Sequence, residues 1–233
     1  MLLLSIETST PVCGVALVDD GQVCAQYTLD LGIHHSTHLF PMVERVLADR
    51  QADVTDLDGL AVASGPGSFT GLRIGMASAK ALCMSANVPL VGVSTLAGMA
   101  YSIGCEGIPV CAMLDARRDQ VYAGIYEWKE EAFVASVPDF AVNIEDLLDL
   151  LPHPALFIGD GAWAHHHTIK ARLGKKAYFA GRELGRPNAG AIALLGCIQL
   201  HLGKQVDIDT FEPQYLRASQ AEKVLEARLA KES

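Results

Sequence analysis

The first 30 residues constrain the fold of this chain more than any other segment. Residues 2–8, 14–19 and 22–29 read as short strands, and Asp20-Gly21 between the last two is typical of a two-residue hairpin turn. These runs predict an antiparallel meander of three strands. A Rossmann-type nucleotide-binding domain is disfavoured, because its first strand leads directly into a helix.

Helices and strands alternate after this meander. The apolar spacing predicts helices over residues 34–50 and 70–86, and short apolar strands over residues 57–64 and 88–93. The resulting order, βββαβαβ, is that of one lobe of the actin-like ATPase (ASKHA) fold. We therefore expect an α/β protein of this fold, with two lobes that each hold a mixed sheet flanked by helices.

A glycine-containing stretch predicts the boundary between the lobes. We expect the first lobe over residues 1–104 and a second, degenerate lobe over residues 105–233. The second lobe is expected to include a long helix from Pro187 to His201, because proline suits the first turn of a helix. A polar tail follows, with a short apolar anchor at residues 211–216.

Composition and charge exclude several classes of protein. The formal net charge of -9 argues against a protein whose whole surface binds nucleic acid. Six cysteines without a C-x-x-C pair indicate a reduced, cytosolic chain in which cysteine serves as a small hydrophobic residue. No apolar run approaches the roughly 18 residues of a membrane span, and the amino terminus lacks the basic start of a signal peptide. We therefore expect a cytoplasmic protein that does not enter a membrane.

The turn after the first strand is the first candidate site. Its residues are Glu7, Thr8, Ser9 and Thr10. In actin-like ATPases the corresponding hairpin wraps a nucleotide phosphate, and an acid there helps to hold hydrated magnesium. Short hydroxyl side chains and backbone N–H groups suit phosphate oxygens. The alternative is an ordinary polar hairpin tip, since the acidic motif is incomplete.

A glycine-rich segment before the helix over residues 70–86 is the second candidate site. Its residues are Gly65, Gly67 and Ser68. A helix N-terminus attracts anions through its free N–H groups. The glycine spacing does not fit the dinucleotide fingerprint, and no lysine follows Gly71 as in a Walker A loop. Anion contact and a tight strand-to-helix turn capped by Ser68 both stay open.

The helix over residues 70–86 is apolar on more than one side, and only Arg73 and Lys80 in it are charged. One side is expected to pack on the chain's own sheet, and another on the helix over residues 34–50 or on a partner chain. Two such helices side by side could form a four-helix interface with an equivalent pair. The residues predicted to line it are Leu39, Val43, Leu47, Leu72, Met76, Ala79 and Cys83.

Histidines and basic residues are candidates for metal and RNA binding. The histidine clusters are His34, His35 and His38, and His165, His166 and His167. Neither has the H-E-x-x-H spacing of a zinc protease, so solvated or helix-capping histidine is expected. A basic stripe, opposed only by Glu183, consists of Lys170, Arg172, Lys175, Lys176, Arg182 and Arg186. It predicts either a contact with a tRNA backbone or a solvated face.

Several segments together resemble one known family. They are residues 6–10, 34–39, 64–75 and 88–96, and Pro213-x-Tyr215-Leu216-Arg217. Through them the chain resembles the TsaB (YeaZ) family, densely over the first 100 residues and more loosely beyond. The run from Gly65 to Arg73 is the most specific of these segments.

The chain departs from TsaD, the catalytic relative of this family. TsaD-like chains carry an H-M-E-G-H metal motif after a Val-Pro strand, and its two histidines correspond to Thr95 and Met99 here. An Asp-Glu pair after their first hairpin corresponds to Pro11 and Val12. The resemblance therefore implies a pseudo-enzyme with no metal and no required cofactor, which leaves room for weak or interface-shared ATP or ADP.

The resemblance also implies partners. It implies that the chain binds and supports TsaD as a heterodimer, through the helices at residues 34–50 and 70–86. The assembly, with the ATPase TsaE, transfers a threonylcarbamoyl group to N6 of adenosine 37 in ANN-decoding tRNAs. The chain would then meet tRNA only indirectly, and a homodimer of the free chain stays open.

Two other functions stay open on the residues alone. An active phosphotransferase or ATPase of this fold would need acids to hold magnesium, and the candidates are Glu7 and Asp115. A metallopeptidase is the third hypothesis, which the missing pair of histidine ligands disfavours.

Overall fold

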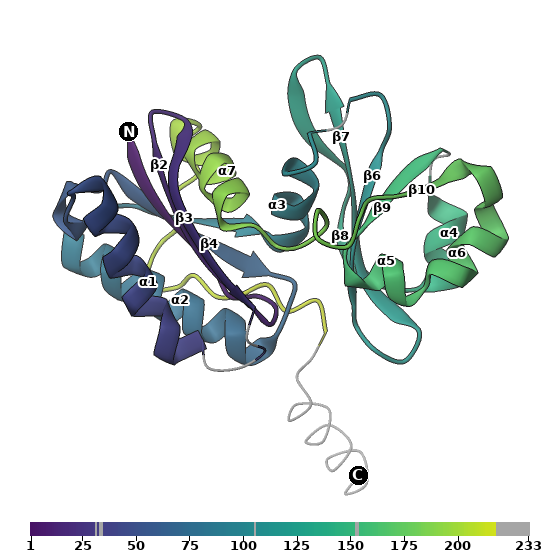
Figure 1. Cartoon of the computed structure of the whole chain (residues 1–233), viewed down its shortest axis with the longest axis horizontal. Helices are drawn as coiled ribbons and strands as arrows, with labels where there is room; N and C mark the ends of the chain where they lie inside the picture. The colour runs from purple at the N-terminus through teal and green to yellow at the C-terminus, as the bar shows by residue number, and fades with distance from the viewer. Residues whose placement is uncertain (31, 33–34, 105, 152–153, 218–233) are drawn as a thin grey trace, which may run out of the picture.

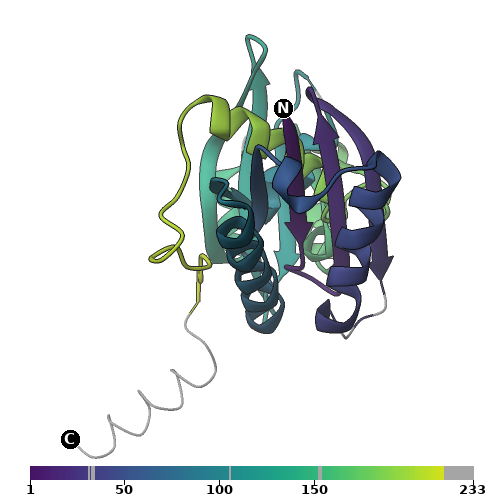
Figure 2. The same cartoon turned by 90° about the vertical axis from the view of Figure 1, so that its left-hand side faces the viewer.

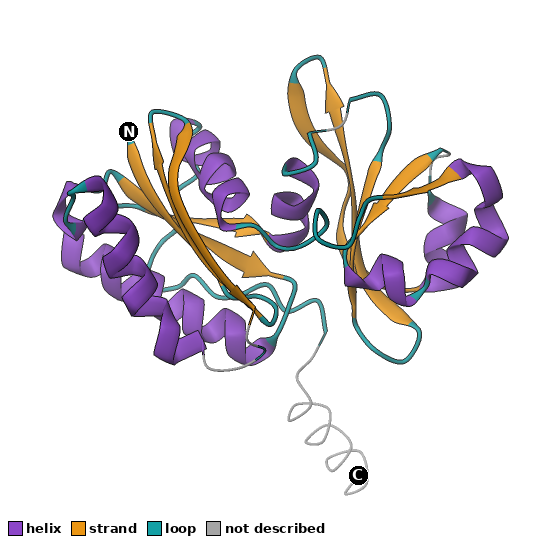
Figure 3. Ribbon diagram, viewed as in Figure 1, coloured by secondary structure: helices purple, strands orange, loops and turns teal. Residues whose placement is uncertain are grey.

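Two five-stranded sheets, each with helices on its faces, form the two lobes of the molecule (Figures 1 and 3). This computed structural model describes residues 1–30, 32, 35–104, 106–151 and 154–217. His34, Cys105 and the tail beyond Arg217 lie outside the described residues. The arrangement confirms the predicted α/β fold.

The first sheet has the strand order β3-β2-β1-β4-β5. Its strands are β1 (Leu2–Glu7), β2 (Val12–Asp19), β3 (Gln22–Asp30), β4 (Gly59–Gly65) and β5 (Leu90–Ser94). Leu4 of β1 lies opposite Leu17 in the antiparallel pair with β2 and opposite Leu60 in the parallel pair with β4. A meander of three strands therefore continues into helix-linked parallel strands, as predicted.

Helices cover both faces of the first sheet. Two of them, α1 (His35–Arg50) and α2 (Phe69–Ala86), lie on one face, and Figure 2 shows them side by side in front of the strands. The hydroxyl of Ser68 accepts a hydrogen bond from the backbone N–H of Gly71 at 3.3 Å and so caps α2. A short 3-10 turn (Val54–Asp56) precedes β4, and the helix α3 (Thr95–Tyr101) follows β5.

The helix α7 (Ala189–His201) covers the other face of the first sheet, so its assignment to the second lobe was wrong. Its Ile192 and Ala193 pack in one cluster with Leu3 and Val91 of the sheet. That face of the sheet is apolar and needs a cover, which an all-apolar helix supplies. The helix also begins later than expected, because Asn188, rather than a residue before Pro187, caps it by accepting from Ala191 N–H at 3.0 Å.

Residues 204–217, here called the C-terminal strap, also return to the first lobe. Val206 forms an antiparallel bridge with Leu90. The ring of Phe211 lies over Gly92, where a Cβ would come within 2.1 Å of the Phe211 Cζ. The strap therefore needs a glycine at position 92, and the second lobe is an internal segment of the chain.

The second sheet has the order β10-β9-β6-β7-β8. Its strands are β6 (Val110–Asp115), β7 (Gln120–Lys129), β8 (Ala132–Asn143), β9 (Ala155–Ile158) and β10 (Ala177–Phe179). Its helical elements are α4 (Ile144–Leu150), α5 (Asp160–Ala164), α6 (His166–Leu173) and the 3-10 turn Gly174–Lys176. Within the described ranges of both lobes, no helix has the length and apolar character to cross a membrane.

A part-buried polar cluster joins the two lobes. Ser94, at the end of β5, and Tyr126, on β7, both donate hydrogen bonds to the carboxylate of Asp139 on β8. Burial raises the pKa of Asp139 and that of Tyr126, and the neighbouring carboxylate raises the pKa of Tyr126 further. The first lobe therefore contacts the second through directed hydrogen bonds as well as through the apolar packing of α3.

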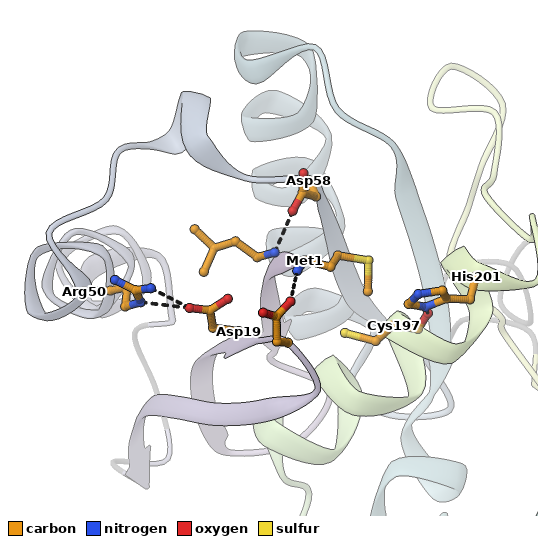
Figure 4. A network of polar contacts seen from close by, with 8 residues as sticks. Met1, Asp19, Arg50, Asp58, Cys197 and His201 are labelled. Atoms are coloured by element: carbon orange, nitrogen blue, oxygen red, sulfur yellow. Dashed lines mark hydrogen bonds and ion pairs between the residues drawn. The ribbon is translucent and has the colours of Figure 1, made fainter.

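Polar contacts also hold the amino-terminal end of β1 (Figure 4). The Met1 ammonium contacts Asp20, and the Leu2 N–H donates to Asp58 at 2.7 Å. Arg50 at the end of α1 donates to Asp19 at 2.6 Å. The first two contacts fix the start of β1 to the turn after β2 and to the residue before β4, and the third ties the end of α1 to β2.

Candidate functional site

The tip of the β1–β2 hairpin packs directly against the start of α2. The Thr8 hydroxyl donates to the carbonyl oxygen of Gly71 at 2.8 Å, and the Ser68 N–H donates to the carbonyl oxygen of Ser9 at 2.6 Å. A Cβ on Gly67 would lie 2.2 Å from the Ser9 oxygen. Gly67 and Gly71 therefore allow two backbones to approach closely. This supports the tight-turn alternative for this segment.

Glu7 is buried rather than exposed to a ligand. One carboxylate oxygen accepts the Ser9 N–H at 2.6 Å, and the other has no hydrogen-bond partner among the described residues. Burial raises the pKa of Glu7 to about 7, against the lowering effect of its hydrogen bonds with Ser9. Burial, with a smaller contribution from the charge of Glu7, raises the pKa of Cys13 to about 11. Glu7 and Cys13 therefore both lie buried inside the first lobe.

A cleft of about 540 Å³ lies between the lobes. Thr10 and Pro11 line it from the first lobe, and Asp115, Arg117 and Arg182 line it from the second. Asp115 accepts the N–H of Arg117 at 2.8 Å. Glu7 does not line this cleft, so the structure keeps Glu7 apart from Asp115. The other acids in the lining are Asp30 and Asp160.

The remaining residues of the two nucleotide-related motifs lie near the cleft or inside the first lobe. Thr10 is half-buried, and its hydroxyl accepts the N–H of Val12 at 3.3 Å. Gly65 is buried with a φ of 115°, and a Cβ there would lie 2.7 Å from the carbonyl oxygen of Gln214 in the strap. Gly65 therefore makes room for the strap, a role that the sequence alone did not indicate.

The histidines do not form a metal site in the described part of the chain, where no group of three or more His, Cys, Asp or Glu side chains is suited to hold a metal ion. His166 stacks on Trp163 at 5.3 Å and lies 4.4 Å from Phe179. Thr95 and Met99, in the positions of the TsaD histidines, are fully buried in α3.

Much of the basic stripe is already engaged. Arg172 pairs with Asp149, and Arg186 pairs with Asp30 at 2.9 Å. Lys170 donates to the Ala177 carbonyl oxygen at 3.2 Å, and the Arg182 guanidinium lies 4.9 Å from the Trp163 ring. These partners favour the solvated-face alternative for the stripe.

The residues predicted to line a partner interface are buried in the first lobe. All seven, Leu39, Val43, Leu47, Leu72, Met76, Ala79 and Cys83, are at most 5% exposed. Their rows face the chain's own sheet, because an apolar helix face is most stable when the sheet beside it covers it. The prediction that these seven residues form an exposed partner surface was therefore wrong.

The outward side of the same two helices carries a different set of residues, here called the α1–α2 outer face. Its exposed members are Phe40, Glu44, Ala48, Ala77, Ala81 and Met84. Phe40 is 44% exposed and Met84 is 68% exposed. Ala77 and Ala81 are one turn apart on α2, and both are small and exposed.

Comparisons with known proteins agree with this architecture. Residues 30–224 match the family model described as TsaD: tRNA N6-adenosine threonylcarbamoyltransferase. The tRNA threonylcarbamoyladenosine biosynthesis protein TsaB of Bacillus subtilis is 34% identical, covering 95% of this chain and 96% of its own. TsaB of Escherichia coli is also 34% identical, with coverages of 97% and 98%.

Solved structures also resemble this chain. YeaZ from Pseudomonas aeruginosa superposes with a TM-score of 0.79 at 26% identity, covering 92% of this chain and 99% of that one. The ethanolamine utilization protein EutJ from Carboxydothermus hydrogenoformans shares the fold, with a TM-score of 0.51 at 12% identity over 84% and 90% of the two chains. From its sequence and its structure together, the chain belongs to the TsaB (YeaZ) family of tRNA threonylcarbamoyladenosine biosynthesis proteins, within the wider TsaD family.

Proposed function

We propose that this chain is a non-catalytic scaffold subunit in the modification of adenosine 37 in ANN-decoding tRNAs, and that it binds and supports a TsaD-type catalytic subunit. The observation that carries the proposal is the α1–α2 outer face, where two adjacent helices expose apolar and small side chains. Helix pairs of this kind pack against equivalent pairs at small interaxial distances.

The composition of this face suits a protein partner. Phe40 and Met84 supply large apolar side chains, which often anchor interfaces. Ala77 and Ala81 between them allow a partner helix to approach closely. Covering several hundred Å² of such surface at ~25 cal/mol per Å² is enough to offset a large part of the cost of association.

The acids support a scaffold more than an enzyme. The Glu7 carboxylate is buried against Ser9, and the acids that line the cleft, Asp30, Asp115 and Asp160, do not include it. We propose that the chain needs no cofactor of its own, and that any ATP or ADP binds weakly or at an interface shared with the catalytic subunit. In this proposal the chain acts in the cytoplasm. It contacts tRNA and a TsaE-type ATPase only as part of the complex.

The test is a pair of charge insertions on two exposed helices. Ala81→Arg places a cation in the α1–α2 outer face, and Ala171→Arg places one on the exposed side of α6 as a matched control. We expect Ala81→Arg to lose co-elution with the catalytic subunit in size exclusion, and Ala171→Arg to keep it, while both give the wild-type circular dichroism spectrum. If a folded Ala81→Arg still co-elutes and supports tRNA modification, the proposed face is wrong.

A further inference from the structure

Residues from two distant parts of the chain hold the guanidinium of Arg73 in place beside the α1–α2 outer face. The Arg73 guanidinium carbon lies 3.9 Å from the centre of the Phe69 ring and 5.9 Å from that of Tyr215. The Arg73 Nε–H donates to the Tyr215 hydroxyl at 3.0 Å, and the two rings are 4.9 Å apart. Phe69 and Tyr215 are each 37% exposed, so the cluster lies at the surface.

The strap fixes Tyr215 in this position. The N–H of Gln214 donates to the Ser64 carbonyl oxygen at 2.7 Å, at the end of β4. Arg217 donates to the carbonyl oxygen of Ala116 at 2.6 Å and so ties the end of the strap to the second lobe. Tyr215 is therefore held from both sides, and its ring and hydroxyl orient the arginine.

Arg73 has no carboxylate partner within ion-pair distance among the described residues, although the chain carries a net charge of -9. Its Nε is engaged by Tyr215, which leaves the two terminal nitrogens as an unused fork of donors. A groove of about 370 Å³ beside it is lined by Arg73, Ala77 and Lys80 of α2 and by strap residues that include Glu212 and Tyr215. Ala77 is common to this groove and to the α1–α2 outer face.

We infer that Arg73, held between Phe69 and Tyr215, is a receptor for an aspartate or glutamate side chain of the protein that docks on the α1–α2 outer face. A planar guanidinium held by stacking binds a carboxylate through two parallel hydrogen bonds and loses little side-chain entropy in doing so. The inference rests on the proposed function, because Ala77 makes the groove continuous with the proposed docking face. A nucleic acid phosphate suits the same fork, but a nucleic acid carries many phosphates. The net negative charge of the chain therefore disfavours it more than it disfavours a single protein carboxylate.

The experiment measures the affinity of the full chain for the catalytic subunit by titration calorimetry at low and high ionic strength. We expect Arg73→Gln to weaken binding about 10- to 100-fold, as the loss of a charged bidentate pair does. Arg73→Lys should recover only part of this loss, since it keeps the charge without the fork. Tyr215→Phe should weaken binding less than Arg73→Gln, because it removes only the hydroxyl that orients the guanidinium. The control is Lys176→Gln, which removes an exposed cation from the second lobe and should leave affinity within about threefold.

Thermal melting of each variant separates recognition from folding. A purely structural cluster would give a lowered melting temperature with unchanged affinity, and this outcome would overturn the inference. Equal losses for Arg73→Gln and Lys176→Gln would also overturn it, because general charge would then explain binding. So would an Arg73→Gln variant that keeps full affinity for the catalytic subunit but loses binding to a tRNA anticodon stem-loop. If Ala81→Arg abolishes the complex while Arg73→Gln does not weaken it, the proposed function stands and this inference fails.

Discussion

Thr8 and Gly71 lie in direct contact: the Thr8 hydroxyl bonds to the Gly71 carbonyl, and a Cβ on Gly71 would lie 2.1 Å from the Thr8 carbonyl oxygen. Neither backbone can move away easily, because α2 packs on β4 and Thr8 follows the last residue of β1. We therefore expect Gly71→Ala to lower the free energy of unfolding by roughly 1–3 kcal/mol or more through overpacking. Gly181→Ala is the control, because a Cβ on Gly181 would meet no atom of a non-neighbouring residue within 4 Å. Urea denaturation of both variants measures the difference, and equal midpoints would show that the hairpin does not press on α2.

Glu7 predicts an unusual dependence of stability on pH. Its pKa is raised from 4.5 to about 7 on folding, so the folded protein favours the neutral acid. The stabilisation that neutral Glu7 gives the folded state is therefore complete below pH 4.5. As the pH rises to about 7 this stabilisation is lost, and the free energy of unfolding falls by up to about 3 kcal/mol. We expect Glu7→Gln to remove this decline, so that the variant gains on the wild type above pH 7. Urea denaturation across this pH range tests it, and parallel curves for the two proteins would contradict the prediction.

Ala79 faces the core, so a charge there should affect folding rather than binding. It is fully buried and belongs to the cluster that contains Leu39 and Met76. We expect Ala79→Arg to unfold the first lobe or leave it insoluble, because a buried unpaired charge costs several kcal/mol. Ala77→Arg, two positions earlier and exposed, should fold normally. Circular dichroism distinguishes the two, and a folded Ala79→Arg protein would place this side of α2 at the surface.

Asp139 accepts hydrogen bonds from one residue of each lobe. Replacing it by alanine leaves the hydroxyls of Ser94 and Tyr126 without this acceptor in a half-buried site. At about 1–3 kcal/mol for each of these two groups, we expect Asp139→Ala to cost roughly 2–6 kcal/mol. Asp146→Ala, at an exposed acid of α4, should cost less than about 0.5 kcal/mol. Urea denaturation followed by circular dichroism measures both, and similar stabilities would argue against a polar link between the lobes.

The elements of the first lobe could be predicted from the sequence, because neighbouring residues mark its turns and helix caps. Asp20-Gly21 forms the predicted hairpin, and Ser68 caps α2 as expected. In the second lobe the sequence does not mark β8 as a strand, because this edge strand is half exposed and contains Pro138, which interrupts a strand pattern. The three-residue strand β10 is too short to give a pattern of its own.

The functional surface was harder to predict than the fold. Helical periodicity separates the row of Met76 and Ala79 from the row of Ala77 and Ala81, but α2 is apolar or small in both. Which row faces the sheet depends on packing that periodicity does not contain. The contact between Arg73 and Tyr215 spans 142 positions, so only the folded chain reveals it.

Because α7 covers one face of the first sheet, the first lobe cannot be completed during synthesis until α7 has been made. The strands β1 to β5 emerge first, but one face of their sheet stays uncovered until residues 189–201 have been made. The whole second lobe is synthesised in that interval, and it can collapse on its own core around Met113 and Phe157. The amino-terminal half therefore waits for the carboxy-terminal end of the chain, and during synthesis its apolar sheet is the surface that a chaperone would have to shield.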